Sequence, residues 1–378
     1  FEFVFKSNFE LIKSSKRLVV KVGSKLLVDE TDGKIRESWL NSLCEDIARW
    51  KTNGQELIIV SSGAIALGRR YLNLRSGDLK LEEKQAAAAA GMVRLAHAYH
   101  ESLSKYNLSV AQILLTLNDS EDRRRYLNAR STINTLLSVS AVPLINENDT
   151  IATDEIRFGD NDRLAARVAT MVSADLLILL SNIDGLYTSD PQEENAAQLV
   201  PLITEVTPEI EAMAGDIVSV DSSGGMPTKL AAAKQCLSAA CKMVISEGMD
   251  EYPLKRLEDG ANCSWFLPSS NPQTSRKLWI AGSLQSCGSI KVDAGATAAL
   301  KDGSSLLPAG VLEVSGSFQR GDAITILDEK GIEIGRGLSA YSYADASKIK
   351  GHKTDEIASL LGFIGRLEMI HRDDLVIF

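Results

Sequence analysis

The strongest constraint on the fold is an alternation of short apolar runs with longer helical patterns through the first two-thirds of the chain. The apolar runs are too short for helices and lack polar alternation, which is typical of strands buried on both faces. Helices between such strands cross one face of a sheet and return the chain in the same direction. The sequence therefore predicts an α/β domain, a mostly parallel sheet sandwiched by helices.

Individual elements can be placed from these patterns. Strands are expected at residues 18–22, 57–60, 110–115, 142–145, 176–180 and 242–245, and helices at 37–50, 82–104, 162–173 and 229–240. A further helix, capped by Asp119 and Ser120 with acidic residues in its first turn, is expected to run to Val139. Residues 1–16 lack the pattern of a signal peptide, so we interpret them as a frayed extension, in part an expression scar.

The character of the chain changes near residue 268. Residues 268–275 contain two prolines and several small polar residues, which is typical of a linker. Beyond the linker, glycines recur and helical periodicity largely disappears. Short strand-like runs occur at residues 278–281, 289–292, 311–314, 323–327, 332–334 and 375–378. We expect two domains: an α/β domain over residues 17–268 and a small mostly-β domain over residues 276–378.

Charge and hydropathy exclude several classes of protein. The formal net charge is −9, which argues against a chain built mainly to coat nucleic acid or an anionic membrane. No apolar run approaches the roughly 20 residues needed to span a bilayer. The five cysteines have no CxxC spacing and there are only four histidines, so a Cys/His zinc site is not expected. We expect reduced cysteines and a cytoplasmic protein.

Three glycine-containing loops lie where a strand meets a helix. They are Lys21-Val22-Gly23-Ser24, Ser61-Ser62-Gly63-Ala64 and Ser223-Gly224-Gly225-Met226-Pro227-Thr228-Lys229. Each could be no more than a turn. Together, their lysines, backbone N–H groups and helix N-termini favour phosphate binding. None matches the pattern GxxxxGK[ST] or GxGxxG, so P-loop and simple dinucleotide-binding enzymes are disfavoured.

Two polar stretches also follow predicted strands. The first runs from Asn146 to Thr150 and is followed by Gly159-Asp160-Asn161-Asp162. An Asx-rich turn and a helix cap explain part of this pattern, but not the density of carboxamide and carboxylate side chains at 146–149. Such side chains could bind the charged groups of an amino acid, or organise lysines or Mg²⁺. The second stretch, residues 181–188, is either a plain turn or a place for an adenine or ribose.

No histidine or cysteine lies in any of these loops. A kinase that acts on an alcohol usually needs a base to accept a proton. A carboxylate substrate is already ionised at neutral pH, since its reference pKa is about 4.3. The loops therefore suit an acceptor that needs positioning and charge neutralisation rather than a base.

Taken together, the loops resemble the amino-acid kinase family. The matching segments are KVGSKLL (21–27), SSGAIALG (61–68), EDRRRYLNAR (121–130), VPLINENDT (142–150), FGDNDRLAA (158–166), DGLYT (184–188) and GGMPTKLAAA (224–233). Four C-terminal segments resemble a PUA domain: RKLWIAG (276–282), DAGATAAL (293–300), GSSLLPAG (303–310) and HRDDLV (371–376). The resemblance covers about residues 17–378 and is specific to the branch that phosphorylates glutamate.

The resemblance implies ATP-dependent phosphorylation of the L-glutamate γ-carboxylate, the first step of proline synthesis, with Mg²⁺ as cofactor. By match to the family motifs, Lys21 and Lys229 would stabilise the transferring phosphoryl group, and Asp162 would hold the two lysines. The residues implied for glutamate are Ser62, Asp149 and Asn161. Those implied for ATP are Lys21, Ser181, Asn182, Ser223, Gly224, Gly225, Met226, Pro227, Thr228 and Lys229. No metal-ligating residue is assigned.

Three positions depart from the family pattern: Asn182 replaces an aspartate, Arg157 a lysine and Pro227 a serine. None is one of the two lysines, so we expect an active enzyme. Asn182 also motivates an alternative, a regulatory protein on a kinase scaffold with impaired turnover. The resemblance further implies a homo-oligomer and feedback inhibition by L-proline.

RNA binding is the competing hypothesis, because PUA domains occur in RNA-modifying enzymes. Residues 276–378 hold 12 Lys or Arg against 13 Asp or Glu, with no basic cluster of the kind that dominates nucleic-acid affinity. We therefore favour a structural or regulatory role for this domain.

Overall fold

The computed structural model describes residues 7–29, 31–75, 77–116, 119, 122–151, 161–189, 197–214, 225–268 and 286–378. The chain divides into two units, Phe1–Pro272 and Gln273–Phe378, which are taken one at a time below. Within the described ranges, no helix combines the length and apolar character needed to cross a membrane.

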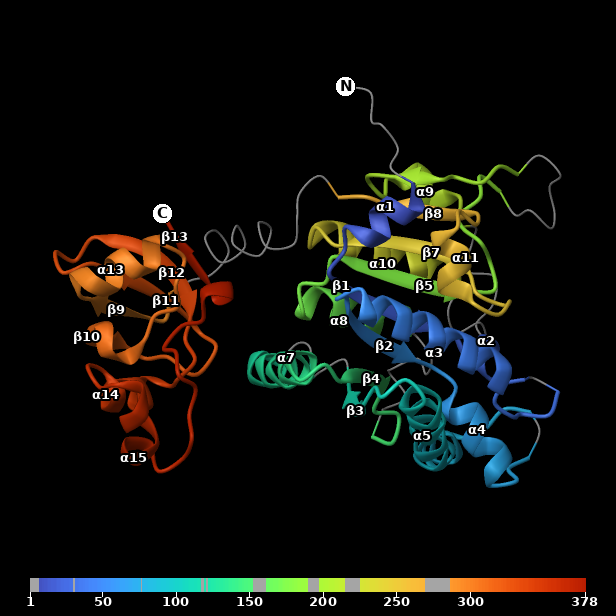
Figure 1. The fold of residues 1–378 in the computed structure, drawn as a ribbon, viewed down its shortest axis with the longest axis horizontal. Helices are drawn as coiled ribbons and strands as arrows, with labels where there is room; N and C mark the ends of the chain where they lie inside the picture. Colours follow the sequence, from blue (N-terminus) through green and yellow to red (C-terminus); the bar gives the residue numbers. More distant parts are fainter. Residues whose placement is uncertain are drawn as a thin grey trace. The chain divides into compact units, whose positions relative to one another are not determined.

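An eight-stranded sheet forms the middle of the first unit (Figure 1). Its order is β3-β4-β2-β1-β5-β7-β8-β6, with bounds β1 Arg17–Val22, β2 Glu56–Ser61, β3 Val110–Leu115, β4 Val142–Glu147, β5 Leu176–Ser181, β6 Leu202–Ile203, β7 Lys242–Glu247 and β8 Cys263–Phe266. All described pairings are parallel except β7 with β8. The predicted mostly parallel sheet is confirmed, and each predicted strand lies within an observed one.

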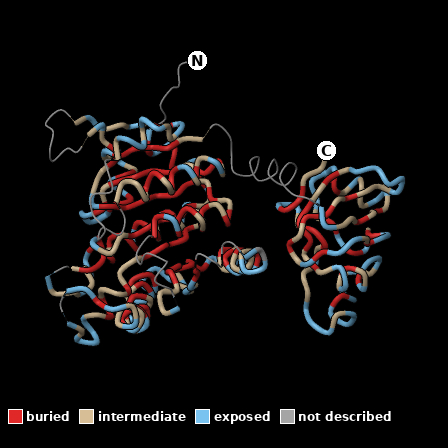
Figure 2. The backbone as a smooth tube through the Cα atoms, turned by 180° about the vertical axis from the view of Figure 1, so that it is seen from behind, coloured by how far each residue is buried: buried red, intermediate tan, exposed pale blue. Residues whose placement is uncertain are grey.

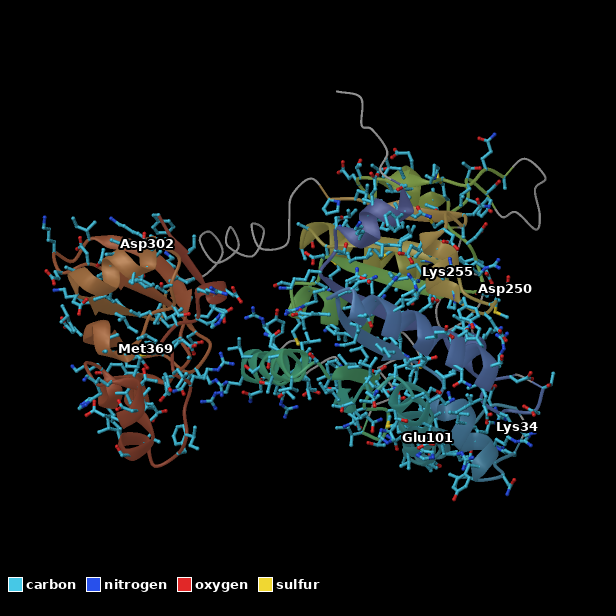
Figure 3. The ribbon with its side chains drawn as sticks, viewed as in Figure 1. Lys34, Glu101, Asp250, Lys255, Asp302 and Met369 are labelled. Atoms are coloured by element: carbon cyan, nitrogen blue, oxygen red, sulfur yellow. The ribbon has the colours of Figure 1, made fainter. Side chains whose placement is uncertain are left out.

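Helices cover both faces of this sheet. The described helices of the unit are α1 Asn8–Lys13, α2 Ser24–Leu27, α3 Glu37–Thr52, α4 Ala64–Tyr71, α5 Leu81–Ser104, α7 Arg123–Ser138, α8 Asn161–Met171, α9 Pro208–Ala212, α10 Met226–Ser238 and α11 Pro253–Glu258. Side chains alternate along β1: Leu18 and Val20 join the apolar cluster under α3, α5 and α11, whereas Val19 joins the cluster under α7, α8 and α10. The central strands are therefore buried on both sides (Figure 2). Charged side chains such as Lys34, Glu101 and Asp250 lie at the surface (Figure 3).

The predicted cap of helix α7 at Asp119 is wrong. Helix α7 begins at Arg123, and its cap is Asp122, whose carboxylate accepts the backbone N–H of Arg125 at 2.9 Å. Asp119 instead accepts the backbone N–H and the hydroxyl of Thr116, so its carboxylate closes the turn after β3. The other oxygen of Asp119 accepts from the side chain of Arg125 at 3.0 Å, and the capping bond to the helix backbone comes from Asp122.

The N-terminal segment is also more ordered than expected from residue 7 onward. Helix α1 buries Leu11 and Ile12, and the Asn8 amide donates to the carbonyl oxygens of Leu257 and Ala261. Interpreting these residues as a frayed extension was wrong, because their apolar side chains complete the cluster next to α11. The sequence feature that could have predicted this helix is the capping box of Ser7 and Glu10, which stabilises its first turn.

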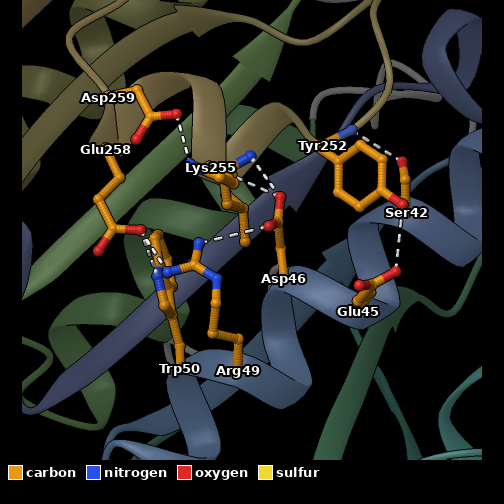
Figure 4. A network of polar contacts seen from close by, with 10 residues as sticks. Ser42, Glu45, Asp46, Arg49, Trp50, Tyr252, Lys255, Glu258 and Asp259 are labelled. Atoms are coloured by element: carbon orange, nitrogen blue, oxygen red, sulfur yellow. Dashed lines mark hydrogen bonds and ion pairs between the residues drawn. The ribbon is translucent and has the colours of Figure 1, made fainter.

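A buried carboxylate joins α3 to α11 (Figure 4). Asp46 accepts the backbone N–H groups of Leu254 and Lys255 at 3.0 and 2.9 Å, where α11 has no cap side chain of its own. Arg49, one turn away, pairs with both Asp46 and Glu258. Burial raises the pKa of Asp46, but these bonds satisfy its oxygens and tie the two helices together.

The second unit contains a five-stranded sheet of order β10-β9-β11-β12-β13. The strands are β9 Gly288–Val292, β10 Val311–Gly316, β11 Ala323–Leu327, β12 Glu333–Leu338 and β13 Leu375–Ile377. The expected strand at 278–281 and the expected linker after 268 lie outside the described residues. The unit also has helices α13 Ala294–Lys301, α14 Tyr343–Ile349 and α15 Ile357–Leu361, which the sequence analysis missed. They are too short to display a clear helical period.

Helices α4 and α5 are in backbone contact at two glycines. A Cβ at Gly91 would lie 1.7 Å from the carbonyl oxygen of Ala64, and a Cβ at Gly68 would lie 1.7 Å from that of Ala87. No other residue fits here. Because α4 begins directly after the Ser61-Ser62-Gly63 loop, this contact positions that loop at the end of β2.

We expect Gly91→Ala to lower the free energy of unfolding of the first unit by about 2 kcal/mol or more, because the added methyl group overpacks a backbone contact. Urea unfolding would measure the change. Gly295→Ala in α13 is the control: its nearest atom lies at 3.4 Å, and a change of less than about 0.5 kcal/mol is expected. Equal stability of Gly91→Ala and the unmodified chain would contradict the described packing.

Candidate active site

One buried carboxylate lies between two lysines at the carboxyl end of the sheet. Asp162 in the first turn of α8 is 0% exposed, and its Oδ1 lies 2.6 Å from Lys21 Nζ on β1. Its Oδ2 lies 3.0 Å from Lys229 Nζ on α10 and accepts the Thr228 hydroxyl at 3.2 Å. Three segments that are far apart in sequence therefore meet at a single carboxylate.

The charges of this triad remain paired. Burial acts to raise the pKa of Asp162, but the charges of Lys21 and Lys229 outweigh it and hold the pKa below its ordinary value. Both ammonium groups contact the same carboxylate, and both lysines line a cavity. Ammonium groups held in this way can attract an anionic ligand.

A cavity of about 1160 Å³ opens next to the triad. Both lysines line it, together with the loops that follow β1, β2, β4 and β5 and with the start of α10. Pockets for one small ligand are typically about 300–1,000 Å³, so this cavity has room for two substrates side by side. No histidine or cysteine is among its described lining residues.

The three residues predicted to bind glutamate, Ser62, Asp149 and Asn161, all line this cavity. Asn161 Nδ2 donates to Ser62 Oγ at 2.6 Å, and Asp149 lines the same cavity. Within the described part of the chain, the buried Asn161 Oδ1 has no hydrogen-bond partner, and neither has Asn146 Oδ1. Burial raises the pKa of Asp149 to about 6. Buried acceptor oxygens without donors mark a place where a ligand can donate.

Six of the residues predicted to bind ATP line the cavity: Lys21, Ser181, Asn182, Gly225, Met226 and Lys229. Ser181 ends β5, the exposed Asn182 follows it, and the Ser181 hydroxyl donates to Asn182 Oδ1 at 3.3 Å. Helix α10 starts at Met226 rather than at the predicted 229, so Lys229 lies in its first turn. Gly225 is the N-cap and has no capping side chain, which leaves N–H groups of the helix N-terminus for a ligand.

Some predicted positions do not line the cavity or lie outside the described residues. Pro227 occupies the first turn of α10, where a missing N–H is tolerated, and it does not line the cavity. Thr228 turns away to Asp162 and Gly225. Four predicted positions lie outside the described residues: Ser223, Gly224, Arg157 and Asp160.

Sequence reasoning missed part of the cavity lining. The missed residues include Asp29, Thr31, Arg69, Arg70 and Asn73. The first two lie in the segment that continues from the predicted loop after β1, so the rule that ligands bind after parallel strands could have found them. The other three lie along α4 or just after it, and only the packing of α4 on α5 brings them to the cavity.

Comparison with known families agrees with this architecture. The Amino acid kinase family matches residues 16–246, and the PUA domain matches residues 288–361. The first match covers more than half of the chain. The chain belongs to the amino acid kinase family, and its second unit carries a PUA domain.

The similar proteins share one name. A protein named Glutamate 5-kinase from Paramagnetospirillum magneticum is 60% identical over 365 residues, which cover 97% of this chain and 98% of that protein. Proteins of the same name from Sinorhizobium fredii and Agrobacterium fabrum are each 58% identical, again over 97% of this chain, and over 93% and 94% of their own lengths.

We expect Asp162→Ala to destabilise the first unit by about 3–5 kcal/mol, because it removes the carboxylate that both buried ammonium groups contact. Urea unfolding at neutral pH would measure this loss. Asp162→Asn keeps the shape. Its deficit should begin to shrink below about pH 3.9, where the carboxylate of the unfolded chain becomes protonated, and it should vanish only as the pH falls through the lower pKa of Asp162 in the folded protein. Asp259→Asn, at an exposed pair with Lys255, is the matched control and should have little effect. An Asp162→Ala variant as stable as this control would contradict the buried triad.

Proposed function

We propose that this kinase transfers the γ-phosphoryl group of ATP to the γ-carboxylate of L-glutamate. The products are γ-glutamyl phosphate and ADP, and the reaction is the first step of proline synthesis from glutamate. The observation that carries the proposal is the Lys21–Asp162–Lys229 triad at the edge of a cavity whose described lining has no histidine or cysteine.

This arrangement suits a carboxylate acceptor. A carboxylate oxygen attacks the γ-phosphorus, the bond from that phosphorus to the bridging oxygen breaks, and the electron pair leaves with ADP. The acceptor is ionised at neutral pH, so no proton has to be removed. The remaining requirement is to neutralise charge on the transferring group, which two positioned ammonium groups can supply.

Asp162 acts through the lysines in this mechanism. Fully buried, it fixes the direction of both lysine side chains by ion pairs on opposite oxygens. Lysine is flexible and loses much rotamer freedom when it is held. An ion pair formed before substrate binding removes that cost from the reaction. Asp162 is thus proposed as a positioning residue.

For ATP we propose the start of α10 together with the loop after β5. The phosphates would lie against Gly225, Met226 and Lys229, where backbone N–H groups and one ammonium converge. Asn182 would contact the nucleotide through its amide in place of a carboxylate. Ser223, Gly224, Pro227 and Thr228 belong to the same proposed loop by their sequence motif.

Mg²⁺ fits this site only as part of the nucleotide complex. Across the residues with described positions, no group of three or more His, Cys, Asp or Glu side chains is arranged to hold a metal ion. Mg²⁺ commonly binds phosphates and water with few protein ligands, and it would supply charge neutralisation on the phosphates.

For glutamate we propose Ser62, Asn161 and Asp149. The Ser62–Asn161 pair offers a hydroxyl and an amide near the lysines. Asp149 and the free acceptor oxygens of Asn161 and Asn146 can accept N–H bonds from the substrate ammonium. An organic acid without an amino group would leave these acceptors unpaired, which favours an amino acid as the substrate.

We also propose the domain bounds 17–268 for the kinase domain and 276–378 for the PUA domain. Homo-oligomer formation, inhibition by L-proline and RNA binding stay predictions.

The activity can be tested by trapping the acyl phosphate. With ATP, Mg²⁺ and hydroxylamine, we expect glutamate to give a hydroxamate, whereas glutarate, which lacks the amino group, should give far less. An organic acid that gives more hydroxamate than glutamate would refute the substrate assignment.

Lys229→Met should lower kcat by about 10²–10³-fold, as expected for loss of a group that stabilises the transition state. Lys234→Met, on the exposed side of α10, is the matched control and should remain active. A fully active, folded Lys229→Met variant would refute the catalytic role of Lys229.

The raised pKa of Asp149 gives a second test. Because the pKa lies at about 6, the carboxylate that accepts the substrate ammonium becomes protonated as the pH falls through that value. We expect kcat/KM for glutamate to fall about fourfold between pH 7 and pH 5.5. Asp149→Asn should have a much lower kcat/KM with little dependence on pH in this range. An unchanged pH profile in Asp149→Asn would exclude Asp149 as the titrating group.

A further inference from the structure

Two arginines of the second unit lie on segments that meet at Tyr341, and neither forms an ion pair with a described carboxylate. Arg320 is in the turn before β11, and Arg366 is in the segment that precedes β13. We propose that Arg320 and Arg366 form a binding site for the oxyanion of a phosphate-bearing ligand. This site belongs to the second unit alone and does not depend on the proposed kinase reaction.

The backbone brings both arginines to Tyr341. The turn after Arg320 is bonded to the end of β12, where Gly321 N–H donates to the Ser339 carbonyl at 2.7 Å and Ser339 N–H donates to the Asp322 carbonyl at 3.0 Å. Two residues further on, the Tyr341 hydroxyl donates to the carbonyl oxygen of Arg366. Tyr341 is buried, so it is a firm anchor between the two segments.

Gly365 shows how tightly the second segment is held. A Cβ there would lie 2.5 Å from the Tyr341 hydroxyl oxygen, so the chain next to Arg366 lies directly on the ring. The position of Arg366 is therefore set by packing and not by an ion pair of its side chain.

The surroundings of Arg320 disfavour its charged form. Both arginines are half-buried residues, and burial lowers the pKa of Arg320 below its ordinary value. The charge of Arg366 lowers it further, Tyr341 acts in the opposite direction, and no carboxylate is among the groups that act on Arg320. Burial, Glu368 and Asp345 raise the pKa of the Tyr341 hydroxyl, whereas the charges of Arg366 and Arg320 lower it. Among the described residues, neither guanidinium forms a hydrogen bond or an ion pair.

Several other arginines are ion-paired. Arg336 in the same unit pairs with Glu333 at 2.7 Å, and Arg17 in the first unit pairs with Glu56 at 2.7 Å. Two like charges that are partly removed from water and act on each other favour a bound counter-charge. The guanidinium fork matches the oxygens of a phosphate, and a single phosphate can bridge two such forks.

Neighbouring side chains suit the organic part of such a ligand. Phe363 is 53% exposed and Ile364 is 92% exposed, both in the segment that leads to Arg366. Apolar side chains this exposed beside unpaired cations are typical of a binding surface. The ligand could be a free phosphate compound or the phosphodiester of a nucleic-acid strand, and the experiment below separates these sources.

The test uses labelling of arginine by phenylglyoxal in the full chain, with each site quantified by peptide mass spectrometry. With inorganic phosphate at twice its dissociation constant, labelling of Arg320 and Arg366 should fall about threefold relative to chloride of equal ionic strength. Arg336, which is ion-paired, is the internal control and should be unaffected. Equal labelling in phosphate and chloride would overturn the proposal.

Variants show whether the two arginines act together. Arg320→Gln should abolish protection of Arg366 by phosphate, whereas Arg336→Gln should leave it intact. If Arg320→Gln fails to fold, Arg366→Gln tests the same site with phosphate protection of Arg320 as the readout. Unchanged phosphate protection of the remaining arginine in either folded variant would overturn the shared site.

The source of the phosphate is identified with two further probes, AMP and a short single-stranded RNA. If AMP and inorganic phosphate protect the arginines at concentrations similar to the concentration of RNA phosphate groups that protects them, the site binds free phosphate compounds. Protection by RNA at far lower phosphate concentration supports the same arginines as contacts to a strand. Failure of all three probes to protect would refute the site, and it would leave the proposed kinase activity unaffected.

Discussion

The first unit depends on one buried ion-paired cluster. Asp162 has no contact with solvent, and its burial would be very costly without the two lysines that flank it. Each lysine is in turn almost fully buried and needs that carboxylate. The cluster thus holds β1, α8 and α10 in a single relative arrangement, and the same arrangement directs positive charge toward the cavity. In the proposed mechanism, structural and chemical requirements are met by the same atoms.

The sheet explains why these groups can meet. Because β1, β2, β4, β5 and β7 are parallel, their carboxyl ends lie along one edge, and the loops that follow β1, β2, β4 and β5 share one cavity. Two apolar clusters, one on each face, fix the strands and the helices above and below them. The Gly68–Gly91 contact between α4 and α5 then positions the loop that carries Ser62.

Much of this was predictable, and the errors have physical causes. Buried parallel strands produce unbroken apolar runs, so β1 to β5 and β7 could be found by pattern alone. Strand β6 has two residues and β8 has four, too few for a pattern. The cap of α7 was misplaced because Asp119 and Asp122 are equally good caps in sequence, and only the turn at Thr116 distinguishes them. Helices α13 to α15 are stabilised by packing in the second core rather than by a long amphipathic pattern.

For the site, the sequence alone identified the polar and glycine-containing loops, the lack of a histidine or cysteine in them and, through family resemblance, the pairing of Lys21 and Lys229 with Asp162. These features are local, since each is a short motif at the end of a strand or the start of a helix. Tertiary structure alone decided the contributions of Arg69 and Asn73 to the cavity, the unpaired oxygens of Asn146 and Asn161, and the convergence of the segments of Arg320 and Arg366 on Tyr341. The physical reason is that burial, and whether a polar group finds a partner, depend on segments distant in the chain, and no local pattern encodes that distance.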